Sequence, residues 1–334
     1  MTVPIKGIIP VMLTPFDDDG GIDWPGYTTL VEWYLAHGAD ALFAVCQSSE
    51  MFHLSLAERV QLARCTVDLV NGRVPVVACG HISDDLDDQL AELRAIAETG
   101  VDGLILVTNR LAGQQEPDAG TVKASLEHIL SGLPGDLQLG LYECPAPYRR
   151  LLTDDDIRFC ADSGRFVLLK DVSCDLETVT RRVRLAEGSP LAIINANAAI
   201  AWPAMRAGSV GFCGVLNNFH PDLYHWLLAA RHEPSALADE LSVFLALSAT
   251  CESLGYPAIA KLFHQRLGTF KSIRCRANDD DIRARVWAVD AILEKIVEGS
   301  EIYRRKIAGH GSSMSNRVAL PDAAAQLAAF SAAD

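Results

Sequence analysis

The chain has 334 residues, of which 49% are hydrophobic and 22% are charged, and its formal net charge is −14. This composition is typical of a folded protein with a large core and not of a disordered chain, and the length suits one large α/β unit. The acidic balance argues against nucleic acid or an anionic membrane as a partner, although a local cation can still bind a small anionic substrate.

The N-terminal stretch "MTVPIKGIIPVML" lacks the basic start and the long apolar segment of a signal peptide. No run reaches the roughly 18 apolar residues of a membrane span. Nine cysteines without CxxC spacing predict reduced thiols in a cytoplasmic protein, with no metal site. Five of them fall on apolar runs and are interpreted as core-filling side chains: Cys46, Cys79, Cys144, Cys174 and Cys213.

Eight short apolar runs alternate with longer amphipathic segments along the chain. Each run is apolar at both alternating positions, as expected for strands buried on both faces of a parallel sheet. The predicted strands cover residues 7–16, 39–49, 73–83, 101–109, 137–145, 165–173, 191–198 and 210–218.

The segments between these runs carry helix start and stop signals. The helix after the second run opens at Ser55, has Glu58 three residues later as a capping box, and closes at Asn71-Gly72. Alternating strands and helices predict an α/β fold, a (β/α)8 TIM barrel over residues 1–232 that forms the catalytic domain. The competing fold is a doubly wound open sheet, but "TPFDDDGG" after the first strand is not its GxGxxG loop.

Beyond residue 220 the strand signal stops and helical periodicity continues. Segments 234–255, 257–268 and 280–299 predict a C-terminal helical extension, a bundle over residues 233–300 packed on the barrel. Residues 301–334 are predicted as a loop followed by a short terminal helix or tail.

The stretch "RFVLLKDVSCD", residues 165–175, places a lysine at the tip of an apolar strand. Active sites of such barrels lie at the C-terminal ends of the strands, where Lys170 then faces Tyr142 from the preceding strand. Burial disfavours the ammonium form of a lysine and leaves the free amine that attacks a carbonyl carbon. A tyrosine hydroxyl beside it can relay protons. The plain alternative is a snorkelling or salt-bridged lysine at the barrel rim.

Several motifs in order resemble the dihydrodipicolinate synthase / N-acetylneuraminate lyase family of class I, Schiff-base-forming aldolases, over about residues 5–300. The similar segments are "GIIPVMLTPFDDDGGID", "GADALFAVCQSSEMFHLSLAER", "LYECP", "LLKDVSCD" and "PAMRAGSVGFCG". The resemblance implies that Lys170 forms the Schiff base with the substrate and that Tyr142 is the catalytic proton relay. It implies no metal and no organic cofactor.

The chain departs from the family pattern in residues that hold the 2-oxo acid carboxylate and in residues that serve the acceptor substrate. The family's Gly-Thr-Thr-Gly-Glu is replaced by Cys46-Gln47-Ser48-Ser49-Glu50, and Pro147 stands at the place of the usual arginine, with Arg149 as a candidate substitute. The second family tyrosine has no counterpart in "VTNRLAGQ", and Gly214 replaces a serine. The chain is therefore predicted to be a divergent member.

The candidate substrate-binding residues all come from strand ends. Arg110 and Glu143 are candidates for substrate specificity, although each is equally interpretable as a rim charge. The complete set is Gln47, Ser48, Ser49, Thr14, Asn195, Gly214, Arg110 and Glu143.

Three functions remain open at this point. The first is a Schiff-base-dependent lyase, an aldolase or dehydratase, acting on pyruvate or a pyruvate-derived 2-oxo acid. The second is dihydrodipicolinate synthase itself, which condenses pyruvate with aspartate semialdehyde. The third is a non-catalytic regulatory protein that binds 2-oxo acids. The resemblance also implies a homotetramer built as a dimer of dimers.

Overall fold

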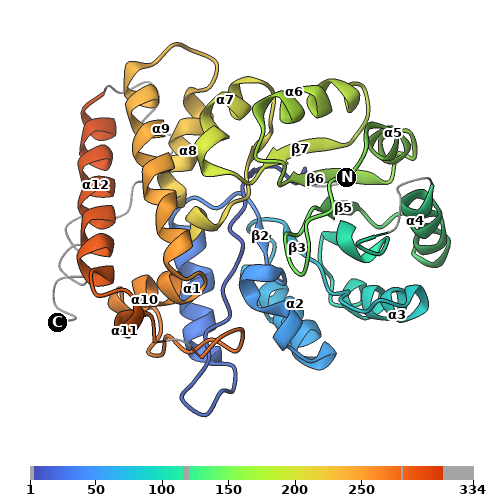
Figure 1. The fold of residues 1–334 in the computed structure, drawn as a ribbon, viewed down its shortest axis with the longest axis horizontal. Helices are drawn as coiled ribbons and strands as arrows, with labels where there is room; N and C mark the ends of the chain where they lie inside the picture. The colour runs from blue at the N-terminus through green and yellow to red at the C-terminus, as the bar shows by residue number, and fades with distance from the viewer. Residues whose placement is uncertain (1–3, 116–119, 280, 311–334) are drawn as a thin grey trace.

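The computed structural model describes residues 4–115, 120–279 and 281–310. Eight parallel strands occupy the centre and helices surround them (Figure 1). Along the sheet the strands follow the order β1-β8-β7-β6-β5-β4-β3-β2. Their bounds are β1 Gly7–Ile8, β2 Leu42–Phe43, β3 Val76–Ala78, β4 Gly103–Val107, β5 Leu139–Tyr142, β6 Phe166–Asp171, β7 Ala192–Asn195 and β8 Gly211–Phe212.

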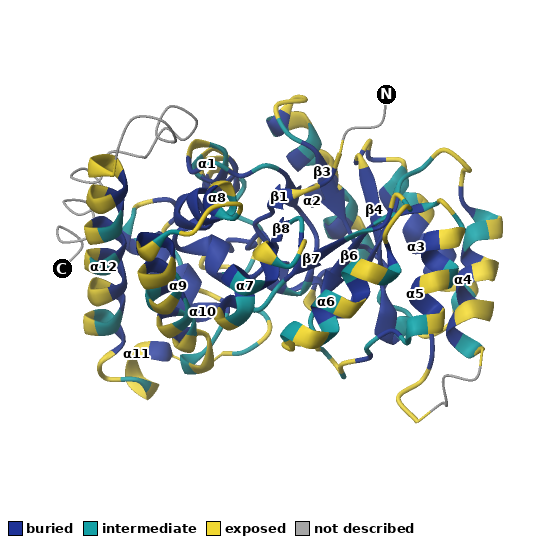
Figure 2. Ribbon diagram, turned by 90° about the horizontal axis from the view of Figure 1, so that it is seen from above, coloured by how far each residue is buried: buried dark blue, intermediate teal, exposed yellow. Residues whose placement is uncertain are grey.

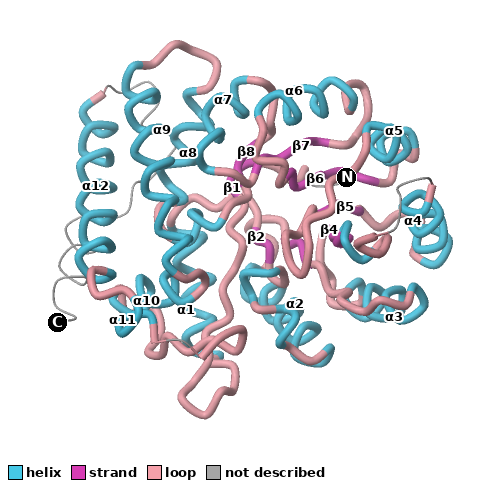
Figure 3. The backbone as a smooth tube through the Cα atoms, viewed as in Figure 1, coloured by secondary structure: helices cyan, strands magenta, loops and turns pink. Residues whose placement is uncertain are grey.

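The sheet closes into a barrel where β1 and β2, the two ends of the strand order, come together. β1 pairs with β8, and the segment after β1 reaches β2 through a parallel bridge between Val11 and Phe43. The Phe43 amide donates to Pro10 O at 3.0 Å, and the Met12 amide donates to Phe43 O at 3.1 Å. The eight parallel strands, drawn in magenta in Figure 3, together with this bridge confirm the predicted (β/α)8 barrel.

The helices cover the outside of the barrel. Their inner faces are buried with the strands and their outer faces are exposed (Figure 2). At the start of α2 the predicted capping box is present, because Ser55 N donates to Glu58 Oε2 at 2.8 Å and Glu58 N donates to Ser55 Oγ at 3.3 Å. The barrel helices are α1 Trp24–Ala36, α2 Leu56–Val70, α3 Leu86–Ala97, α4 Thr121–Gly132, α5 Asp154–Asp162, α6 Leu176–Leu185, α7 Ala201–Arg206 and α8 Pro221–Ala230.

The observed strands are shorter than the predicted runs. Several runs continue past the strand into a single 3-10 turn at the barrel mouth: η1 Gln47–Ser49, η3 Thr108–Arg110 and η5 Val215–Asn218. Cys174, interpreted as core-filling, is exposed with a φ of 60°, because β6 ends at Asp171 and the chain turns away. The other four thiols of that group are buried.

The C-terminal extension packs beside α7 and α8 (Figure 1). It comprises α9 Ala236–Ser248, the 3-10 helix η6 Ala249–Leu254, α10 Ala258–Arg266, α11 Ile282–Arg285 and α12 Val289–Gly309. Within the segment 280–299, predicted as part of the bundle, the described residues form α11 and the first part of α12 with a break between them. α12 continues past residue 300, the predicted boundary of the bundle, to Gly309. The predicted last helix lies outside the described residues.

No single helix in the described ranges is long and apolar enough to cross a membrane. One pair, Ala236–Leu254 with Ala258–Arg266, meets that length and composition only when taken together, and it is bent by 110°.

A buried ion pair ties the extension to the barrel. Lys261 Nζ on α10 donates to Glu50 Oε1 at 2.5 Å, and both side chains are at most 1% exposed. The other carboxylate oxygen of Glu50 accepts from the amides of Arg276 and Ala277 at 2.5 and 2.7 Å. Because Glu50 directly follows the turn η1, this contact places the extension next to the barrel mouth.

Candidate active site

Lys170 and Tyr142 are direct neighbours across β5 and β6. The two residues are register partners, and Lys170 Nζ lies 4.1 Å from the centroid of the Tyr142 ring and 5.5 Å from that of Phe43. Lys170 is only 5% exposed. Within the described part of the chain its amine makes no hydrogen bond and no ion pair. It is therefore not a salt-bridged rim lysine, in contrast to buried Lys261.

The hydroxyl of Tyr142 points toward the turn after β2. It donates to Gln47 Oε1 at 3.4 Å, and the thiol of Cys144 donates to the same oxygen at 3.5 Å. Burial, reinforced by the nearby thiols of Cys144 and Cys46, raises the pKa of Tyr142 well above its usual value. The phenol therefore stays protonated near neutral pH, and it can donate and pass on a proton.

Among the three residues of turn η1, Gln47 has the side chain that contacts Tyr142. Ser49 Oγ donates to Met12 O and Ala44 O, each at 2.9 Å, and Thr14 Oγ1 donates to Ser49 O at 2.9 Å. Through these bonds, Ser49 and Thr14 stabilise the conformation of the turn. Both residues are completely buried, so their contribution to the site is positional.

Ser48 meets a residue that the sequence analysis missed. Tyr256, which follows η6 in the C-terminal extension, lies close enough to Ser48 for the serine hydroxyl to lower its pKa. The Tyr256 hydroxyl also accepts from Asn218 Nδ2 at 3.1 Å, and burial raises its pKa well above the usual value. The extension thus reaches into the barrel mouth beside the turn that carries Gln47.

Asn195 and Gly214 affect the path of the backbone at the ends of β7 and β8. The Asn195 side chain bonds to the backbone of Asn197, donating to its oxygen at 2.7 Å and accepting from its nitrogen at 3.1 Å. A Cβ at Gly214 would lie 2.2 Å from the Phe212 ring and 2.5 Å from Ala196 O. A serine therefore cannot stand at residue 214 unless these neighbours shift.

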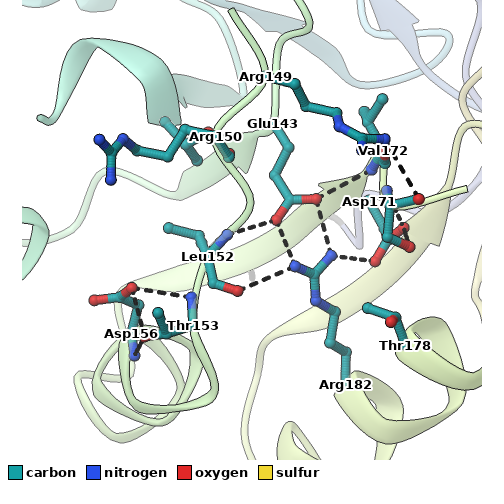
Figure 4. A network of polar contacts seen from close by, with 12 residues as sticks. Glu143, Arg149, Arg150, Leu152, Thr153, Asp156, Asp171, Val172, Thr178 and Arg182 are labelled. Carbon is teal, nitrogen blue, oxygen red and sulfur yellow. Dashed lines mark hydrogen bonds and ion pairs between the residues drawn. The ribbon is translucent and has the colours of Figure 1, made fainter. Parts of the chain in front are cut away.

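Glu143, predicted as a specificity residue, faces away from the barrel interior into a buried ion cluster (Figure 4). Its carboxylate accepts from Arg182 Nη2 at 2.6 Å and Nη1 at 2.8 Å, from Leu152 N at 2.8 Å and from Val172 N at 3.1 Å. Arg182 also pairs with Asp171. These bonds engage both oxygens of the Glu143 carboxylate with protein groups.

This Glu143–Arg182–Asp171 cluster holds the ends of β5 and β6 together. Glu143 directly follows Tyr142 and Asp171 directly follows Lys170, while successive strand residues point to opposite faces. Burial raises the pKa of Glu143, and the charge and hydrogen bonds of Arg182 oppose that rise. The cluster therefore fixes the spacing of Lys170 and Tyr142 without touching a substrate.

The two arginines considered for substrate contact are both engaged with protein groups. Arg110 Nη1 donates to Asp84 Oδ1 at 2.7 Å and to Ile82 O at 3.2 Å, beyond the end of β3. Arg149 is exposed, and its Nη1 donates to the carbonyl of Val172 at 3.1 Å (Figure 4). Arg149 therefore lies at the edge of the mouth beside β6.

Comparisons with known proteins agree with this geometry. The model of the dihydrodipicolinate synthetase family matches residues 4–277. The 4-hydroxy-tetrahydrodipicolinate synthase of Bacillus subtilis (strain 168) is 30% identical over 213 residues, which cover 62% of this chain and 69% of that synthase.

Solved structures share the fold at lower identity. The chloride-inhibited dihydrodipicolinate synthase from Acinetobacter baumannii, complexed with pyruvate, aligns with a TM-score of 0.78 and 22% identity over 87% of this chain and 99% of that one. CdNal from Clostridium difficile, in complex with mannosamine, aligns with a TM-score of 0.78 and 19% identity over 88% and 100%. The chain therefore belongs to the dihydrodipicolinate synthetase family.

Proposed function

We propose that this protein is a Schiff-base-forming lyase, an aldolase or dehydratase, that acts on pyruvate or a pyruvate-derived 2-oxo acid. The observation that carries the proposal is the buried Lys170 amine, which lies against the Tyr142 ring and has no hydrogen-bond or ion-pair partner among the described residues. Family membership supports the same chemistry. A lysine side chain that no protein group engages is available to a substrate carbonyl, and lysine amines form Schiff bases with carbonyl substrates.

The reaction begins when the Lys170 amine attacks the keto carbon. The keto oxygen gains a proton as the amine loses one, and the carbinolamine then loses water to give the iminium. Tyr142, kept protonated by its surroundings, is the relay for these proton transfers. The iminium accepts the electron pair released when a carbon–carbon bond breaks or when the carbon next to the iminium loses a proton. In the second case the enamine that forms returns the pair and expels a hydroxyl group from the following carbon, which leaves as water once it is protonated. Ser48 and the amides of turn η1 are the proposed contacts of the substrate carboxylate.

The proposal predicts covalent trapping of pyruvate by the wild-type protein. Borohydride reduces an iminium to a stable secondary amine, so incubation with pyruvate and borohydride should add a three-carbon adduct. Peptide mass spectrometry should locate that adduct on the peptide "FVLLKDVSCD". An adduct on another lysine, or no adduct with any 2-oxo acid, would remove the basis of the mechanism and favour the non-catalytic binding protein.

The second candidate is 4-hydroxy-tetrahydrodipicolinate synthase, the activity named for the Bacillus subtilis relative. Gln47 and Pro147 stand where the family resemblance places a threonine and an arginine, and Arg110 is held by Asp84. We therefore expect pyruvate and aspartate semialdehyde to give product far more slowly than the about 1–1000 per second of ordinary enzymes. A coupled assay that finds turnover in that range would make this candidate the better one.

Assembly and location complete the proposal. We infer a homotetramer, a dimer of dimers, from the family resemblance, although one structural neighbour is described as a monomeric dihydrodipicolinate synthase variant. A cytoplasmic location is supported by nine cysteines that are all free thiols.

A further inference from the structure

A cavity of about 300 Å³ lies at the barrel mouth between the ends of β6, β7 and β8 and the C-terminal extension. Its barrel side includes Val172, two residues beyond Lys170, and Ala196, directly after β7. Its other side comes from α9 and η6, and includes Ala246, Ala249 and Glu252. The lining is mostly small and apolar, so the cavity has room for a substituent of the substrate.

Glu252 is the charged side chain among the described residues that line this cavity. Within those residues its carboxylate makes no hydrogen bond and no ion pair, so no described protein cation neutralises its charge. Glu252 is exposed at the edge of the cavity; partial desolvation there raises its pKa, and the charge of Lys170 acts in the opposite direction. The carboxylate therefore lies within electrostatic reach of the amine that the proposed function makes the nucleophile.

A second contact connects this segment to the catalytic residues. Tyr256, four residues after Glu252, accepts from Asn218 Nδ2 at 3.1 Å and lies close enough to Ser48 in turn η1 for the serine to lower its pKa. Ser48 in turn is next to Gln47, which contacts Tyr142. The segment from Glu252 to Tyr256 therefore runs from the cavity to the proposed carboxylate-binding turn. A 2-oxo acid bound to Lys170 would have its carboxylate near Ser48 and its distal end in the cavity.

We propose that Glu252 selects the substrate by the charge of its distal group. A carboxylate or phosphate at that end meets the like charge of Glu252 and is rejected, whereas a hydroxyl or ammonium group can donate a hydrogen bond to the carboxylate. The substrate class is thus a 2-oxo acid whose distal end is neutral and hydroxylated, or cationic. This inference rests on the proposed function, because it requires the substrate to be attached at Lys170.

Two six-carbon acids test the inference: 2-oxohexanoate, with a neutral end, and 2-oxoadipate, with a terminal carboxylate. The rate of borohydride trapping on Lys170 is measured for each acid and normalised to pyruvate trapping by the same variant. In the wild type, 2-oxohexanoate should be trapped faster. Glu252→Gln should raise the relative rate of 2-oxoadipate about tenfold, as removal of one unit charge at an effective dielectric of about 20 allows.

Glu298→Gln is the matched control, since Glu298 is exposed on α12 and pairs with Lys295. It makes the same change in net charge and should leave the ratio of the two acids unchanged. If pyruvate is trapped but Glu252→Gln leaves that ratio unchanged, or neither six-carbon acid is trapped, the role of Glu252 is wrong while the proposed function stands. If pyruvate itself is not trapped in the wild type, the result contradicts the proposed function and not only the role of Glu252.

Discussion

Replacing Lys170 with alanine or arginine is expected to abolish the pyruvate adduct and to lower turnover by on the order of 10⁴-fold or more, as loss of a nucleophile does in other covalent mechanisms. Alanine removes the amine, and arginine keeps a cation that cannot deprotonate to attack a carbonyl. Within the described residues no group hydrogen-bonds to the Lys170 amine, so its removal leaves no buried partner unsatisfied. Thermal unfolding of Lys170→Ala should therefore remain cooperative and close to wild type.

The Tyr142→Phe variant separates the nucleophile from the proton relay. It keeps the Lys170 amine and the ring that lies 4.1 Å from it, but loses the hydroxyl that donates to Gln47. Its adduct should form on the same peptide, at a rate lower by about 10²-fold to 10⁴-fold, the usual contribution of one general acid–base group. An adduct that forms as fast as in the wild type would show that Tyr142 does not relay the protons.

The barrel and the juxtaposition of Lys170 and Tyr142 could be predicted from the sequence because both follow from local patterns. Strands buried on both faces are continuously apolar, so a lysine that ends such a run is conspicuous. The order of the strands then places Lys170 beside Tyr142. The outward direction of Glu143 also follows from the sequence, since side chains alternate along a strand and the neighbour of an inward Tyr142 points outward. Its partner Arg182 lies 39 residues away and has no local signal.

Other parts of the site depend on how the extension docks. Glu252 and Tyr256 lie in a helical region whose periodicity shows only that it is amphipathic, not which residues reach the barrel mouth. Their position is set by long-range contacts such as the bond from Lys261 to Glu50, 211 residues apart. The predicted roles of Thr14, Ser49 and Asn195 as substrate contacts differ from their observed bonds for a related reason. A polar side chain at a strand end can hydrogen-bond either to the backbone of a turn or to a ligand, and the sequence does not distinguish the two.

Replacing Arg182 with methionine should cost about 3–5 kcal/mol of folding free energy, because it leaves buried carboxylates without their cation. Arg182 is 1% exposed, and the carboxylates of Glu143 and Asp171 are 0% exposed. Urea unfolding measures the loss. Arg158→Met is the matched control: Arg158 pairs with exposed Asp155 on the surface of α5, and its replacement should cost less than about 1 kcal/mol.

The pH dependence of Arg182→Met distinguishes lost charge from lost packing. Burial raises the pKa of Glu143 and Arg182 opposes the rise, so without Arg182 the folded-state pKa should lie higher still. The folded variant then holds a proton that the unfolded chain has released, and its stability must increase as the pH falls toward the unfolded pKa of about 4.3. The variant should recover part of its deficit between about pH 8 and about pH 5.5. A deficit that is equal across this range would assign the loss to packing.

Because the cluster also spaces the strand ends that carry Lys170 and Tyr142, pyruvate trapping at a pH where the variant is folded should be slower than in Arg158→Met.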